Sequence, residues 1–122
     1  MIIKPFCQPA ARLGSTSGWG QLHTETHVSN GVAVIAMQGD IDGGADATLQ
    51  TAYDAASKHG AGPVLLNFSG VGYINSTGIA LIVGLLARAR KERRQLLACG
   101  LNDHYREIFE ITRLSDFMTT YA

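Results

Sequence analysis

The chain has little of three features that define whole classes of protein. Among its 122 residues it has only two cysteines, no excess of either charge and no long apolar run. Cys7 and Cys99 lie far apart, so they indicate neither a disulfide framework nor the paired spacing of a zinc site. We therefore expect Cys99, which ends an apolar run, to be a reduced core thiol in a protein that works in a reducing cytosol.

The charge balance and the short apolar runs exclude further partners. Lys+Arg and Asp+Glu both number 10, and a nucleic-acid or anionic-membrane partner requires a basic surface, so we expect neither. The longest apolar run, Ile79 to Ala87, is far shorter than the roughly 20 residues of a transmembrane helix. No apolar segment typical of a signal peptide follows Lys4. These absences predict a cytoplasmic protein without stable membrane insertion.

The composition is that of one folded domain. Hydrophobic residues make up 46% and charged residues 16% of the chain, which favours a globular protein over a disordered one. Residues 1–20 combine Pro5, Pro9 and several glycines with a Ser-Thr-Ser cluster. We therefore expect a flexible tail over residues 1–20 and a single domain over residues 21–122.

Strand and helix patterns alternate along the domain. Strands are predicted at residues 22–28, 32–37, 64–68 and 95–99, and helices at 45–58, 76–93 and from Asn102. Asn30-Gly31 predicts a tight hairpin between the first two strands. Residues 117–121 are expected to be a short extended or helical piece. The alternation predicts an α/β fold with a mixed, mainly parallel sheet of four to five strands, flanked by three to four helices.

The most informative stretch runs from Pro63 to Ala87. Residues 64–68 predict a buried strand, and residues 69–75 predict a polar loop. Ser76 then opens a helix whose first turns are so apolar that we expect them to be buried all round. A serine in that place is a typical N-cap, but a hydroxyl at a helix N-terminus also lies where an anion is favoured. On the residues alone, a plain cap is the more common explanation for the Ser76-Thr77 pair.

Enzyme motifs are incomplete in this sequence. Gly70 and Gly72 lie between a strand and a helix, but the third glycine and the acidic residue of a dinucleotide fingerprint are missing. Ser76 lacks the preceding glycine of a nucleophile elbow. The histidines are scattered, and no carboxylate or cysteine completes a metal set with them. We therefore predict no enzyme activity, no cofactor and no metal. Only Gly70 to Gly72 and the helix N-terminus support the alternative of a nucleotide-binding or hydrolytic enzyme.

A longer pattern around Ser76 resembles a known family. The run from Asn67 to Ile79, Asn-Phe-Ser-Gly-Val-Gly-Tyr-Ile-Asn-Ser-Thr-Gly-Ile, resembles the signature of the STAS family. That family groups the anti-sigma-factor antagonists with the cytoplasmic domains of sulphate transporters. Residues 39–42, Gly-Asp-Ile-Asp, resemble the family's turn after the second strand, and Gly84 lies where its helix also carries a glycine. Residues 108–114 resemble its Leu-Phe-x-x-x-Gly-Leu helix end. The resemblance covers about residues 22–119.

The resemblance implies a STAS-like fold and a switched binding function. Such antagonists bind an anti-sigma factor with serine kinase activity and thereby free a sigma factor for transcription. The kinase ends the binding by phosphorylating a serine, and a serine phosphatase reverses this step. The residue that matches this serine is Ser76, with Thr77 as second choice. The matching partner-binding residues are Asp40, Asp42, Asn75, Ser76, Thr77 and Gly78. The resemblance does not decide whether the protein also forms a homodimer.

Two family aspartates are replaced in this chain. Asn75 stands where the family has Asp directly before the serine, and Asn67 stands where it has Asp at the strand end. Both residues keep a short hydrogen-bonding side chain and lose a charge. They favour a second hypothesis, a non-switching STAS adaptor in a stress-signalling scaffold or in a phospholipid or anion transport complex.

Overall fold

The computed structural model describes residues 22–121 apart from positions 30, 59 and 61, so the predicted tail at residues 1–20 lies outside the described residues. The elements follow in the order β1 (His23–Ser29), β2 (Val32–Ile41), η2 (Gly43–Ala45), α1 (Asp46–Ser57), β3 (Val64–Ile74), α2 (Ser76–Lys91), β4 (Leu96–Cys99), α3 (Asp103–Ile111), η3 (Leu114–Asp116) and β5 (Thr119–Tyr121). Here η marks a short 3-10 helix.

Within the described residues, five strands form one sheet in the order β1-β2-β3-β4-β5. Strand β1 is antiparallel to β2, as the predicted hairpin requires, and the other neighbours are parallel. Residues 119–121 form the edge strand β5, so the end of the described chain is extended. The predicted α/β class and mixed, mainly parallel sheet are confirmed.

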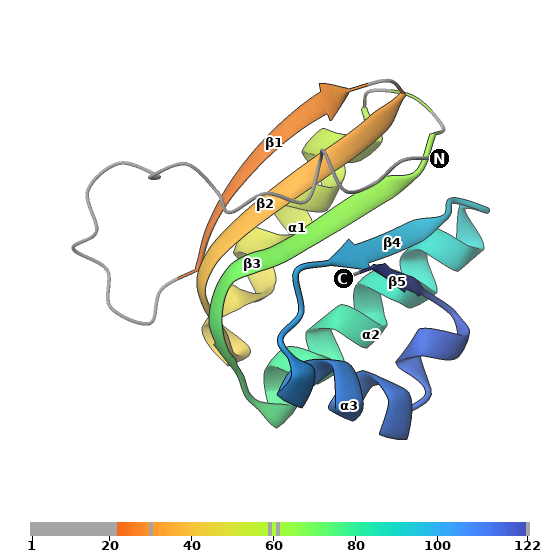
Figure 1. Ribbon diagram of the computed structural model, residues 1–122. Helices are drawn as coiled ribbons and strands as arrows, with labels where there is room; N and C mark the ends of the chain where they lie inside the picture. Colours follow the sequence, from red (N-terminus) through yellow and green to blue (C-terminus); the bar gives the residue numbers. More distant parts are fainter. Residues whose placement is uncertain (1–21, 30, 59, 61, 122) are drawn as a thin grey trace.

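The helices α1, α2 and α3 cover one face of the sheet (Figure 1). Ala45 of η2 and the apolar residues on the inner face of α1 are buried in this core: Ala45, Leu49, Ala52, Tyr53 and Ala56. Because successive residues of a strand point to opposite faces, alternate positions of the strands build a second cluster. Its members are Val32, Val34, Leu65, Leu97 and Cys99.

Cys99 is fully buried, as expected, but it is disulfide-bonded. The prediction of a reduced core thiol was therefore wrong. A disulfide depends on the distance between two residues in the folded chain, and a pair of cysteines far apart in sequence gives no spacing signal for it. Cys7 lies outside the described residues.

Two strands extend further than we predicted. Strand β2 continues to Ile41 and β3 to Ile74, where we expected loops to begin at Gln38 and Ser69. The additional residues pair with one another across register shifts that mark bulges. Local strand propensity is low in these glycine-rich segments, and pairing with the neighbouring strand overrides it. Asp40 therefore lies on a strand opposite Tyr73, not in a loop.

Helix α2 buries one face against the sheet and exposes the other. Its buried residues are Gly78, Ile82, Leu85, Leu86 and Ala89, whereas Ala80, Val83, Gly84 and Ala87 are exposed. The prediction of first turns buried all round was wrong, because the outward face consists of small residues and one valine. Arg88 links α2 to α1. Its guanidinium forms an ion pair with Asp54 of α1 and lies 4.5 Å from the ring centroid of Tyr53, also on α1.

The chain turns after α3 through a left-handed residue. Arg113 has a φ of 64°, and it occupies the position of the glycine in the family's helix-end pattern. A side chain with a Cβ pays about 1–2 kcal/mol in this conformation, which glycine adopts without strain.

We expect Arg113→Gly to raise the free energy of unfolding by about 1 kcal/mol, because it removes this strain. Urea denaturation measures the change. Arg106→Gly is the control: it lies inside α3, and glycine there should lower stability by about 1 kcal/mol. A loss of stability in Arg113→Gly would contradict the strain at this position.

Candidate functional site

Strands β2 and β3 end side by side, and each passes directly into a capped turn. After β2, Asp42 caps η2, and its Oδ1 accepts a hydrogen bond from the Gly44 N–H at 2.9 Å. After β3, Asn75 caps α2, and its Oδ1 accepts from the Gly78 N–H at 2.8 Å. The backbone N–H of Asn75 donates to the carbonyl of Ile41 at 3.2 Å. Both caps are therefore held at one edge of the sheet.

The N-cap of α2 is Asn75, so the prediction that Ser76 caps the helix was wrong. Asn75 has the extended backbone of a cap, and Ser76 is the first helical residue. Asparagine and serine are about equally good caps, so two neighbouring candidates could not be separated by residue type. Ser76 is exposed, and the helix is capped by Asn75 instead of its hydroxyl.

The first turn of α2 leaves two backbone donors without helical partners. The N–H of Gly78 donates to the Asn75 side chain, and the N–H of Ile79 donates to the Asn75 carbonyl at 3.0 Å. The N–H groups of Ser76 and Thr77 have no acceptor inside the helix, as is usual for a first turn. Together with the helix dipole, they favour an anion at this place.

Two glycines bring the ends of β2 and α2 into close contact. A Cβ at Gly78 would overlap the carbonyl oxygen of Ile41, so α2 begins directly against the last residue of β2. A Cβ at Gly43 would lie 3.3 Å from Cγ2 of Thr77. The turn that Asp42 caps is therefore adjacent to the first turn of α2. Gly78 itself is buried, so it positions the helix and offers little surface.

Asp40 lies on β2, two residues before Asp42 and opposite Tyr73 of β3. Its side chain is half-buried on β2 and forms no ion pair within the part of the chain that the structure describes. Its Oδ1 would lie 3.6 Å from a Cβ at Gly72, so it faces the end of β3. Of the six predicted partner-binding residues, five are thus contiguous and Asp40 flanks them.

Two tyrosines at this edge were missed from the sequence. The hydroxyl of Tyr105 on α3 accepts a buried hydrogen bond from the N–H of Ile74 at 2.9 Å, directly before the Asn75 cap. No sequence motif marks a contact of this kind between a helix and the end of a distant strand. Tyr73 on β3 is 53% exposed, and an exposed aromatic side chain of this kind often anchors a protein interface.

Asn67 explains one departure from the family pattern. Its side chain is only 2% exposed, and its Oδ1 accepts from the N–H and the hydroxyl of Ser69 at 3.0 and 2.6 Å. A neutral amide performs this role without the cost of burying a charge.

Neither a metal site nor a membrane span is found in the described ranges. No group of three or more His, Cys, Asp or Glu side chains there could hold a metal ion. No helix there is long and apolar enough to cross a bilayer.

The family model of the STAS domain matches residues 23–122. The chain therefore belongs to the STAS domain family, which confirms the family predicted from the signature around Ser76.

Relatives and solved structures agree with this assignment. The anti-sigma-B factor antagonist of Staphylococcus aureus (strain NCTC 8325 / PS 47) is 28% identical over 97 residues, which cover 80% of this chain and 90% of that protein. The Staphylococcus epidermidis protein of the same name is 27% identical over the same shares. The crystal structure of an anti-sigma factor antagonist from Mycobacterium paratuberculosis has a TM-score of 0.71 at 20% identity, covering 86% and 89% of the two chains.

A further structure of the same fold is that of the Bacillus cell fate determinant SpoIIAA in its phosphorylated form. Its TM-score is 0.61 at 17% identity, with 84% of this chain and 92% of that chain covered. At these identities the structures establish the fold, and they confirm the predicted STAS-like architecture.

The cap assignment predicts different effects of two neighbouring substitutions. We expect Asn75→Ala to lower the free energy of unfolding by about 1 kcal/mol, because the Gly78 N–H loses its acceptor. Ser76→Ala should change it by less than about 0.5 kcal/mol, as is usual for exposed positions. Urea denaturation of both variants measures this, and a larger loss for Ser76→Ala than for Asn75→Ala would overturn the assignment.

Proposed function

We propose that this protein is a phosphorylation-switched anti-sigma-factor antagonist. It binds an anti-sigma factor with serine kinase activity in the bacterial cytoplasm, and phosphorylation of Ser76 ends the binding until a serine phosphatase restores it. One observation carries the proposal: Ser76 is exposed at the start of α2 and has no capping role. The relatives named as anti-sigma-B factor antagonists support it. The protein acts as a regulatory binding partner and not as an enzyme.

Phosphorylation at Ser76 leaves the fold intact in this mechanism. A phosphate brings about −1.5 to −2 charges, and the N–H groups and dipole of the first turn of α2 accept negative charge. The penalty falls on the complex instead, because a partner must desolvate a dianion at the centre of its interface. A penalty of about 3 kcal/mol weakens binding roughly a hundredfold.

The proposed binding surface extends from Ser76 over its neighbours. The half-buried Asp40 and Asp42 flank it on the side of β2, and Tyr73 provides an exposed ring on β3. On α2, a Cβ at Gly84 would meet nothing within 4 Å, so no described neighbour explains a glycine there. A partner that lies close to the outward face of α2 does explain it.

The adaptor hypothesis is not favoured. It was motivated by Asn75 and Asn67, but both side chains keep the hydrogen bonds that organise the edge of the sheet. Their loss of charge therefore leaves the geometry around Ser76 suitable for a switch.

Phosphate mapping tests the switch chemically. We expect incubation with the cognate anti-sigma kinase and ATP to place phosphate on Ser76, as mass spectrometry of the tryptic peptide would show. Ser76→Ala should abolish the modification, and Thr77→Ala is the matched control that should retain it. The proposal is refuted if Ser76 and Thr77 both stay unmodified and the unmodified protein does not bind the anti-sigma factor.

A phosphate mimic tests the effect on affinity. We expect Ser76→Asp to weaken binding to the anti-sigma factor by at least about tenfold, because a carboxylate reproduces part of the phosphate's charge. Its circular dichroism spectrum should match that of the wild type. Calorimetric titration gives the affinities; equal values for wild type, Ser76→Ala and Ser76→Asp would support the non-switching adaptor instead.

A further inference from the structure

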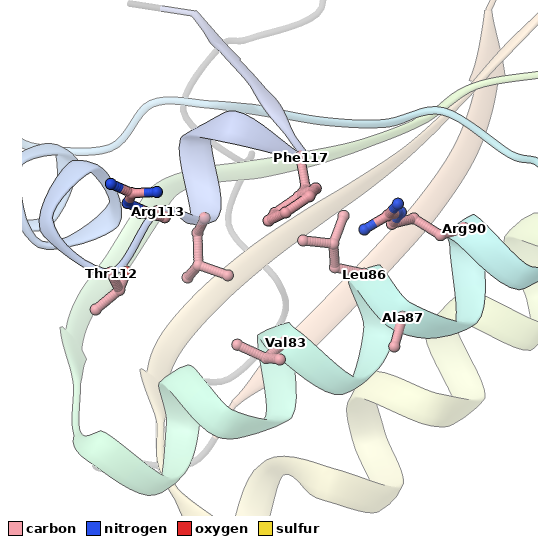
Figure 2. A pocket seen from close by; sticks show the side chains of 8 residues that line it. Val83, Leu86, Ala87, Arg90, Thr112, Arg113 and Phe117 are labelled. Atoms are coloured by element: carbon pink, nitrogen blue, oxygen red, sulfur yellow. The ribbon is translucent and has the colours of Figure 1, made fainter.

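A second surface feature lies near the other end of α2. A cavity of about 250 Å³ separates the later turns of α2 from the segment that follows α3 (Figure 2). It is lined by Val83, Leu86, Ala87, Arg90, Thr112, Arg113, Leu114 and Phe117, and we call it the α2–η3 groove. Small-molecule sites usually measure about 300–1,000 Å³, so this cavity fits one or two side chains better than a cofactor.

The walls of the α2–η3 groove are apolar and exposed. Val83 is 43% exposed and Phe117 53%, while Leu86 and Leu114 form a buried floor. Ile111, which precedes the lining residue Thr112, is 73% exposed. Monomeric proteins rarely leave large apolar side chains clustered in this way, and such a patch commonly marks a contact with another protein.

Two arginines flank this apolar surface. Figure 2 shows Arg90 and Arg113 on opposite sides of Val83 and Phe117, and the guanidinium of Arg90 lies 4.6 Å from the ring centroid of Phe117. No acidic side chain is among the residues that line the cavity. The groove therefore presents positive charge on both sides of an apolar centre.

These two arginines differ from others in the described part of the chain. Arg88, Arg94 and Arg106 each form an ion pair with a carboxylate, whereas Arg93, which does not line the cavity, forms none within the described residues. Arg90 and Arg113 form no ion pair with any residue that the structure describes. Their guanidinium groups are thus available for a carboxylate from outside the chain.

Arg113 also stays in a conformation that costs stability. Its left-handed φ of 64° suits glycine, yet an arginine occupies the position. Strained residues cluster at functional sites, although Arg93 beyond the end of α2 is also left-handed, with a φ of 56°.

We propose that the α2–η3 groove binds an acidic segment of a partner protein. A large apolar side chain of the segment enters the cavity, and carboxylates on both sides of it pair with Arg90 and Arg113. Arginine suits this role because its planar fork binds carboxylates bidentately. The groove begins about 10 Å along α2 from Ser76, at Val83, and Arg90 lies about 20 Å away. Its lining does not include Ser76, although at Val83 it borders the outward face of α2 around Gly84. Binding in the groove therefore does not require an unmodified Ser76.

A peptide titration tests the groove without the native partner. The probe is the capped peptide Glu-Glu-Ala-Leu-Ala-Phe-Leu-Ala-Glu-Glu, compared with the same peptide carrying lysine in place of every glutamate. In ¹H–¹⁵N spectra of the full chain, we expect the acidic peptide to shift the amides of Val83, Ala87 and Phe117 saturably. The basic peptide should bind at least about tenfold more weakly. No saturable shift up to about 1 mM, or equal binding of both peptides, overturns the proposal.

Two variants and a matched control locate the contact. We expect Arg90→Glu to weaken the acidic peptide about tenfold, whereas Lys91→Glu, the same charge change on the next residue, stays within about twofold. Lys91 does not line the cavity. Arg113→Gly should also bind the acidic peptide more weakly, although it relieves backbone strain. This variant therefore tests the groove even if Arg90→Glu does not fold. Equal losses for Arg90→Glu and Lys91→Glu would overturn the proposal.

Discussion

The hydrogen bond from the Gly78 N–H to the Asn75 side chain is the interaction on which the functional surface depends. It starts α2 immediately after β3, and the missing Cβ of Gly78 lets that start rest against the carbonyl of Ile41. A larger residue at position 78 would separate the helix from the sheet. Because Asn75 provides the cap, the hydroxyl of Ser76 is not needed to cap the helix, and Ser76 lies exposed at its start.

A switch placed there changes recognition without changing the fold. In this proposal the N–H groups of the first turn accept an added anion, while a docking partner must desolvate it. In the proposed mechanism, phosphorylation of Ser76 closes one binding surface on α2, and the α2–η3 groove provides contacts that do not change with phosphorylation. One helix, held by the sheet and by Arg88, positions both.

Much of the fold followed from local patterns, and the errors have a common origin. The hairpin signal between the first two strands and the helix start at Asn102 are local signals: β1 pairs antiparallel with β2, and Asn102 caps α3. The ends of β2 and β3 were missed because their pairing partners lie more than 30 residues apart. The candidate surface was found only through the family signature. The Tyr105 contact and the groove depend on residues that approach each other only in the folded chain.

The most direct measurement compares amide spectra of the protein before and after phosphorylation, together with its affinity for the anti-sigma factor. We expect shift changes confined to the first turn of α2 and the adjoining Asp42 turn, with a loss of affinity of roughly a hundredfold. Shift changes spread through α2 and the sheet, or an unchanged affinity, would contradict a switch that acts at the surface.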